Sequence, residues 1–85
     1  MKTIWKYEIT AGKTLEIECG ELSEALKVQN IGGKIYMWFL HDNSTKEKVT
    51  KKYKVFSTGC LIEENIKYID TFFVGDLVFH FCEII

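Results

Sequence analysis

The chain has 85 residues and a net charge of −1 at pH 7, and 47% of its residues are hydrophobic. This composition excludes a disordered chain and predicts one globular domain over residues 1–85. The near-neutral charge gives the chain no general attraction to nucleic acid.

The sequence also bears on where the protein works. No apolar run reaches the length of a membrane-spanning helix, and the amino terminus lacks the charged start and apolar stretch of a signal peptide. The three cysteines, Cys19, Cys60 and Cys82, cannot all pair within one chain and show no Cys-x-x-Cys spacing, which is typical of a reducing compartment. We therefore expect a soluble cytoplasmic protein with no membrane partner.

The amino-terminal third predicts two strands. Apolar and polar residues alternate over Thr3–Thr10 and again over Thr14–Cys19, so each segment has one apolar face. The short turn Ala11–Lys13 between them predicts that they pair as a first hairpin. The segment Glu21–Ala25 is too short for a stable helix and is expected to be a loop.

A second hairpin is predicted around Gly32-Gly33, because both central residues of a two-residue type I′ turn need a positive φ. The predicted register places Ile31 opposite Lys34, Gln29 opposite Tyr36, Val28 opposite Met37, Lys27 opposite Trp38 and Leu26 opposite Phe39. Alternation then divides the hairpin into two faces. The core face comprises Leu26, Val28, Ile35, Met37 and Phe39, and the other face carries Lys27, Gln29, Tyr36 and Trp38. The strand Lys34–His41 is apolar on both faces and should be an interior strand covered on both sides, by the sheet's own packing or by another subunit.

The rest of the chain continues the strand pattern. Val49–Thr58 alternates as a strand and carries the only basic cluster, Lys51, Lys52 and Lys54. Ile66–Phe73 and Leu77–Ile84 predict a last hairpin that turns at Gly75-Asp76 and places Thr71 opposite His80, Phe72 opposite Phe79 and Phe73 opposite Val78. The whole pattern predicts an all-β fold, a small antiparallel barrel or sandwich of about seven short strands linked by tight hairpins.

No catalytic motif is present, so we expect no enzyme and no cofactor. His41, His80, Cys60 and Cys82 are residue types that bind metals, but the paired spacing of zinc sites is missing and we expect no metal. Thr71 lies opposite His80, whereas alternation puts Asp70 on the other face, so these residues should not form a relay. Cys60 could act as a nucleophile with a histidine, but nothing in the sequence favours its thiolate.

The candidate ligand site joins aromatic and basic residues. Tyr36, Trp38 and Trp5 can stack on a nucleobase. Lys27, Lys52 and Lys54 can neutralise phosphate. The alternatives stay open: the aromatic residues can also belong to the core or to a subunit interface, and lysines on an edge strand can simply prevent edge-to-edge pairing.

The last strand bears on assembly. Leu77–Ile85 is apolar on both faces, and a chain of this size has little other material with which to cover them. We therefore expect a homo-oligomer in which a sheet face or edge is buried against another copy.

Several segments taken together resemble a family of small phage and prophage proteins that is carried as a domain of unknown function. The segments are Met1–Tyr7 (MKTIWKY), Val28–Asp42 (VQNIGGKIYMWFLHD), Phe56–Gly59, Tyr68–Phe72 and Val78–His80. The resemblance spans nearly the whole chain and implies a compact β protein of phage origin.

The chain departs from the family pattern at two places. The pattern has glycine where Asp70 stands, and proline-glycine in the loop near Glu21–Glu24. By analogy with small phage proteins, we expect a counter-defence binder in the host cytoplasm that sequesters a nucleotide-like signal in a homo-oligomer. The alternative is an inhibitor or accessory protein that binds a host or defence protein.

Overall fold

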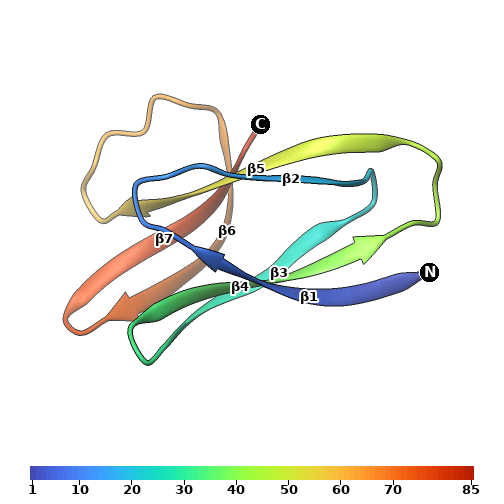
Figure 1. Ribbon diagram of the computed structural model, residues 1–85. Helices are drawn as coiled ribbons and strands as arrows, with labels where there is room; N and C mark the ends of the chain where they lie inside the picture. The colour runs from blue at the N-terminus through green and yellow to red at the C-terminus, as the bar shows by residue number, and fades with distance from the viewer.

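The computed structural model describes residues 1–85 and contains seven strands and no helix (Figure 1). The strands are β1 (Lys2–Ile9), β2 (Leu15–Gly20), β3 (Glu24–Ile31), β4 (Lys34–Asp42), β5 (Lys48–Ser57), β6 (Ile66–Val74) and β7 (Leu77–Ile84). The predicted all-β class is confirmed, and the strand ends differ from the predicted ones by at most one or two residues, apart from the start of β3.

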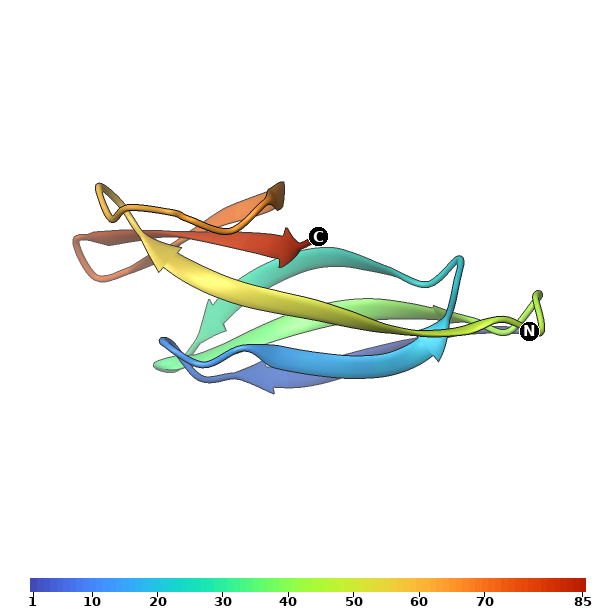
Figure 2. The ribbon, with the colours of Figure 1, turned by 90° about the horizontal axis from the view of Figure 1, so that it is seen from above.

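The strands form two antiparallel sheets that lie as two layers (Figure 2). Sheet A has the order β1-β4-β3, and sheet B has the order β2-β5-β7-β6. No backbone ladder joins the sheets. The predicted interior position is confirmed, since β4 lies between β1 and β3. The chain does not supply the cover predicted for both faces of this strand, because Tyr36 and Trp38 stay half-buried on the outer face.

The hairpin of β3 and β4 has the predicted register from Ile31–Lys34 to Lys27–Trp38. Its turn residues Gly32 and Gly33 have φ values of 60° and 89°, which is the left-handed region that their place in the turn requires. A local signal in the sequence therefore set the pairing of these two strands.

The predicted register fails at the start of β3. A β-bulge between Ala25 and Lys27 places Ala25, and not Leu26, opposite Phe39. Because the bulge takes Leu26 out of the alternation, its side chain is 43% exposed, and its prediction as a core residue is wrong. The expected loop before β3 is also shorter than predicted, since the strand begins at Glu24.

The predicted first hairpin is wrong. β1 pairs with β4 and β2 pairs with β5, so the two strands belong to different sheets. The turn after Thr10 carries the chain from one layer to the other. The physical reason is burial: strands with one apolar face each can cover one another across a two-layer core, whereas a hairpin would place both apolar faces in the same layer.

The hairpin of β6 and β7 has the predicted register at Thr71–His80, Phe72–Phe79 and Phe73–Val78. The segment between β5 and β6 lies over the outer face of sheet B, where Phe56 and Cys82 are buried (Figure 1). The chain itself thus supplies part of the cover that the sequence assigned to another copy.

The core lies between the two sheets and is built from alternate residues of both. Its largest fully buried rings belong to Phe39 of sheet A and to Tyr53 and Phe81 of sheet B. The Tyr53 ring stacks on Phe81 with centroids 5.5 Å apart and meets Phe39 edge-on at 5.9 Å. These contacts hold the two sheets in register.

Side chains close the gap between the edges of β3 and β6. The backbone N–H of Val28 donates to Asp70 Oδ2 at 3.1 Å, and Asn30 Nδ2 donates to the Phe73 carbonyl at 3.2 Å. A bulge between Tyr68 and Asp70 interrupts β6 there. Asp70 is thus a structural link between the sheets.

Replacing Asp70 with alanine should lower the free energy of unfolding by about 1–3 kcal/mol, because the Val28 N–H loses its acceptor. Urea unfolding followed by circular dichroism measures the change. Asp70→Asn is the matched control, since it keeps an acceptor oxygen and should lose less. Equal stability of Asp70→Ala and wild type would contradict this role.

Gly20 ends β2 against β4, and a Cβ atom there would lie 2.0 Å from the Asp42 carbonyl oxygen. Gly20→Ala should therefore destabilise the protein by about 1–3 kcal/mol through overpacking. Glu18→Ala, at an exposed position of the same strand, is the control and should stay within about 0.5 kcal/mol of wild type. Thermal unfolding compares the three proteins, and a Gly20→Ala Tm equal to that of wild type would refute the close approach.

Candidate functional site

The candidate site lies on the outer face of sheet A. Alternation along β4 points Met37 and Phe39 into the core, where both are fully buried, and turns Tyr36 and Trp38 outward, where they are half-buried. The two outward rings meet edge to face with centroids 6.5 Å apart. They form the centre of a sheet surface that no other element of the chain covers.

The neighbouring strands supply polar and basic groups beside these rings. In the register of sheet A, Trp38 lies between Lys6 of β1 and Lys27 of β3. Tyr36 lies between Glu8 and Gln29 in the adjacent row. We call Tyr36, Trp38, Lys6, Lys27 and Gln29 the aromatic face.

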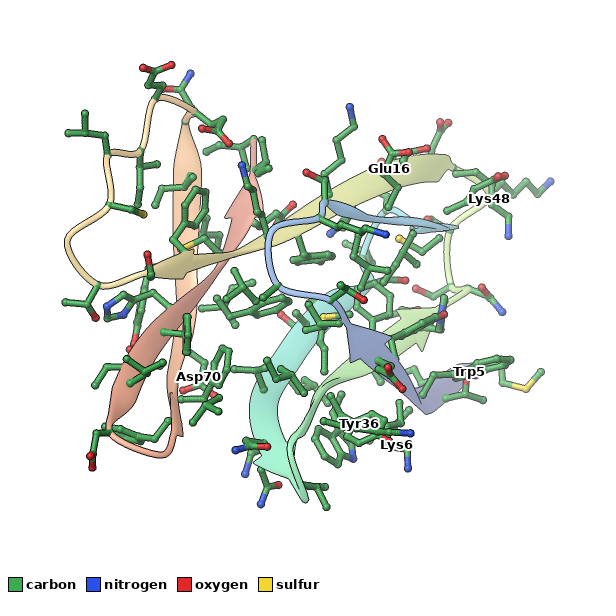
Figure 3. The ribbon with its side chains drawn as sticks, turned by 60° about the vertical axis from the view of Figure 1, so that its left-hand side comes forward. Trp5, Lys6, Glu16, Tyr36, Lys48 and Asp70 are labelled. Carbon is green, nitrogen blue, oxygen red and sulfur yellow. The ribbon has the colours of Figure 1, made fainter.

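Lys6 makes the closest contact within the aromatic face. Its Nζ lies over the Tyr36 ring, 4.6 Å from the centroid (Figure 3). This geometry is a cation–π contact, which holds a positive charge over the face of the Tyr36 ring.

The lysines of the aromatic face have no carboxylate partner. The two ion pairs of the chain lie on sheet B, where Lys52 contacts Glu16 at 3.5 Å and Lys54 contacts Glu64 at 3.3 Å. Lys6 and Lys27 therefore lie on either side of Trp38 without an ion pair. Such an arrangement can stack a planar group and neutralise an anion attached to it.

The aromatic face is open. None of the hollows of the surface is lined by Tyr36 or Trp38. A small ligand that lay on these rings would stay exposed on one side unless a second surface covered it.

The structure brings together only half of the predicted ligand residues. Tyr36, Trp38 and Lys27 share the aromatic face, whereas Lys52 and Lys54 lie on β5 in the other sheet. Their ion pairs occupy both lysines, and a hydrogen bond from its own backbone N–H together with Lys54 lowers the pKa of Glu64. The third lysine of the basic cluster, Lys51, donates to the Ser23 carbonyl.

Trp5 also lies apart from the aromatic face. It is on the side of sheet A that faces sheet B, and it is 56% exposed at the end of the layer (Figure 3). Its Nε1 donates to Thr3 Oγ1 at 3.1 Å, and the His41 ring meets it edge-on at 5.7 Å. A ligand on Trp38 would therefore not touch Trp5.

Sequence reasoning missed Lys6 as a member of the site. Lys6 reaches Trp38 only because β1 pairs with β4, and the predicted hairpin paired that segment elsewhere. The alternation of Thr3–Thr10 does place Lys6 on the polar face of its strand. The sequence therefore predicted the face on which Lys6 lies, but not the strand with which β1 pairs.

The two histidines are bound to hydroxyl groups. Thr71 Oγ1 contacts His80 Nδ1 at 3.1 Å, and Thr58 Oγ1 contacts His80 Nε2 at 2.9 Å. Asp70 points to the other face, toward Val28, as alternation predicts. No three histidine, cysteine or acidic side chains gather in a way that could hold a metal ion.

His41 belongs to sheet A, on a different face from the aromatic residues. Its Nε2 lies 2.6 Å from the Tyr7 hydroxyl. Burial raises the pKa of Tyr7, and the nearby Cys19 adds to the shift, so the phenol stays protonated and can donate to the imidazole. The imidazole of His41 is thus held by a hydrogen bond to a tyrosine, and no ion pair joins it to a carboxylate.

The cysteines differ in access. Cys60 is exposed, whereas Cys19 and Cys82 are buried. Burial, with a further contribution from Cys60, raises the pKa of the Cys82 thiol.

A thiol reagent at neutral pH should therefore label Cys60 quickly and the two buried cysteines only after unfolding, since the thiolate is the reactive form. Mass spectrometry counts the labels, and rapid labelling of two thiols in the folded protein would contradict the burial of Cys82.

None of the structure's elements is a helix of the length and apolarity that crossing a membrane requires. No curated protein and no solved structure matches the chain. A family model, the domain of unknown function DUF7352, matches residues 1–84. Because the match covers nearly the whole sequence, the chain belongs to the DUF7352 family of unknown function.

Proposed function

We propose that this protein is a binding protein and that the aromatic face holds a nucleotide-like ligand. The observation that carries the proposal is the position of Trp38 between Lys6 and Lys27, neither of which has a carboxylate partner. A base would stack on Trp38 or Tyr36, and the lysines would neutralise its phosphate. Stacking on an aromatic side chain contributes about 1–3 kcal/mol per base in sites of this kind.

The openness of the aromatic face leads to the second part of the proposal. Small-molecule sites bury most of the ligand's surface, and a flat sheet face cannot do so alone. We propose that a homo-oligomer completes the site, with a second copy of the chain covering the ligand or extending the surface.

The proposal assigns no catalytic step to the protein. Both ring nitrogens of His80 contact threonine hydroxyls, and His41 contacts a tyrosine. Neither imidazole has the carboxylate that orients a general base in hydrolytic triads. The function proposed is therefore binding, with no cofactor.

The resemblance to small phage and prophage proteins extends the proposal to a biological role. A phage protein that binds a nucleotide without transforming it would act in the host cytoplasm, where it would sequester a nucleotide-like signal of a defence system. This step is an analogy with a class of proteins, and the aromatic face supplies only its chemical part.

A protein partner is the second candidate, and the flatness of the face favours it. Ile4, which is 61% exposed, and the half-buried Leu40 extend the aromatic face with apolar surface. Flat surfaces with central aromatic residues and a charged rim are typical of protein interfaces. In this case the protein would inhibit or assist a host or defence protein.

The nucleotide proposal is tested by thermal unfolding with nucleoside phosphates, cyclic dinucleotides and short oligonucleotides. A ligand at 100 times its Kd adds about 2.7 kcal/mol of stability, which raises the Tm of a domain of this size by about 10 °C or more. Trp38→Ala and Lys27→Ala should abolish the shift. Lys52→Ala is the matched control, because Lys52 lies on the other sheet, and it should keep the shift.

Two results would contradict the nucleotide proposal. One is a shift that Lys52→Ala removes and Trp38→Ala leaves in place, which would move the site to sheet B. The other is the absence of any shift together with a host protein that co-purifies at near-equal stoichiometry and is lost with Trp38→Ala, which would establish the protein-partner function.

A further inference from the structure

β1 is an open edge of sheet A, since it pairs only with β4. The Asn43 N–H donates to the Met1 carbonyl at 3.1 Å, which places Met1 in a hydrogen-bonded pair at the end of the ladder. Hydrogen-bonded pairs alternate along antiparallel strands, so Thr3, Trp5 and Tyr7 bond to β4. The backbone groups of the residues between them, Lys2, Ile4, Lys6 and Glu8, therefore point away from the sheet.

Nothing in the chain satisfies these outward groups. No turn, loop or side-chain hydrogen bond reaches the backbone of Lys2, Ile4, Lys6 or Glu8. Folded proteins rarely leave such a row of donors and acceptors available on a long, flat strand, because another strand can pair with it.

The other edge strands are less suited to pairing. β3 and β6 are each interrupted by a bulge and are tied to one another through Asp70 and Asn30. β2 has only six residues. β1 pairs over eight residues without a bulge, and it exposes an apolar side chain on each face, Ile4 and Trp5.

We propose that a second copy of the chain occupies this edge, with the two β1 strands antiparallel about a two-fold axis at Trp5. The outward residues are the even-numbered ones, so they must face even-numbered residues of the partner. With Trp5 opposite the partner's Trp5, Lys2 lies opposite the partner's Glu8 and Ile4 opposite the partner's Lys6. Trp5 then forms a close non-hydrogen-bonded pair with its copy, which is a favourable position for two aromatic side chains.

Charge favours this register over those in which the two-fold axis lies at a neighbouring residue. An axis at Ile4 would place Lys2 opposite the partner's Lys6, and an axis at Lys6 would place two copies of Lys6 opposite one another. Like charges directly opposite destabilise a strand pair. Shifting the axis further, to Thr3 or Tyr7, shortens the overlap. The Trp5 axis gives the longest overlap without a like-charge pair.

The pairing would join two copies of sheet A into one sheet with the order β3-β4-β1-β1-β4-β3. Both aromatic faces would lie on the same side, because the two-fold axis is perpendicular to the sheet. The two Trp38 residues would be three strand spacings apart across the sheet and two residues apart along the strands, a separation of about 16 Å. The pairing of the two β1 strands thus supplies an interface for the homo-oligomer proposed above. Because dimerisation is measured without ligand, its failure and the failure of nucleotide binding can be told apart.

Sedimentation equilibrium of the wild-type protein should show a dimer, and Ile4→Pro should convert it to a monomer. The Ile4 N–H points outward, so proline there breaks no bond to β4, and the circular dichroism spectrum and the monomer fold should stay unchanged. Ile4→Thr, which keeps the N–H, is the matched control and should remain dimeric. A monomeric wild-type protein, or a dimeric Ile4→Pro variant that keeps its fold, overturns the proposal.

Cross-linking tests the register. In a Cys60→Ser background, mild oxidation should convert Trp5→Cys into a disulfide-linked dimer, because Cα atoms across a non-hydrogen-bonded pair lie about 4.5 Å apart. Ile4→Cys should stay reduced, since the two copies of residue 4 would lie more than about 7 Å apart. Glu8→Lys should weaken the dimer about tenfold, and adding Lys2→Glu should restore it. Cross-linking of Ile4→Cys in place of Trp5→Cys overturns the Trp5 axis.

Discussion

The position of β4 in the middle of sheet A is the constraint on which the rest of the structure depends. Because β4 pairs with β1 on one side and β3 on the other, its alternate side chains must separate cleanly between the core and the outer face. Met37 and Phe39 enter the core, where Phe39 meets Tyr53 of sheet B. Tyr36 and Trp38 must then point outward, and the same two neighbours bring Lys6 and Lys27 to the sides of Trp38. One strand thus fixes both the packing and the candidate site.

The sequence predicted the parts of the fold that depend on local signals. Gly32-Gly33 and Gly75-Asp76 are turns that join adjacent strands. The predicted pairs of the second hairpin are confirmed, and those of the first are confirmed from its turn as far as Lys27–Trp38, where a bulge ends the agreement. The pairing of β1 with β4 joins residues that are 26 to 40 positions apart, from Ile9–Ile35 to Lys2–Asp42, and no turn residue encodes it. The Ala11–Lys13 turn suggested a hairpin, whereas the need to bury two apolar faces against one another placed β1 and β2 in different layers.

For the candidate site, too, the sequence predicted the part that depends on local signals and missed the part that depends on long-range pairing. Tyr36, Trp38 and Lys27 lie on one locally encoded hairpin, and sequence alternation placed them on a common face. Lys6 reaches that face through a long-range pairing, so the sequence offered no way to connect it with Trp38. Lys52 and Lys54 were expected near the aromatic residues, but long-range pairing of β5 with β2 and β7 places them in the other sheet, each beside a glutamate.

Native mass spectrometry of the protein purified from a natural host, compared with Trp38→Ala purified in the same way, tests the central claim most directly. We expect the wild-type protein to appear as a homo-oligomer that carries extra mass of nucleotide size, released by heating. The Trp38→Ala variant should keep the oligomer and lose that mass. Bare wild-type protein, or a bound mass that Trp38→Ala retains, would contradict the assignment of the aromatic face as the binding site.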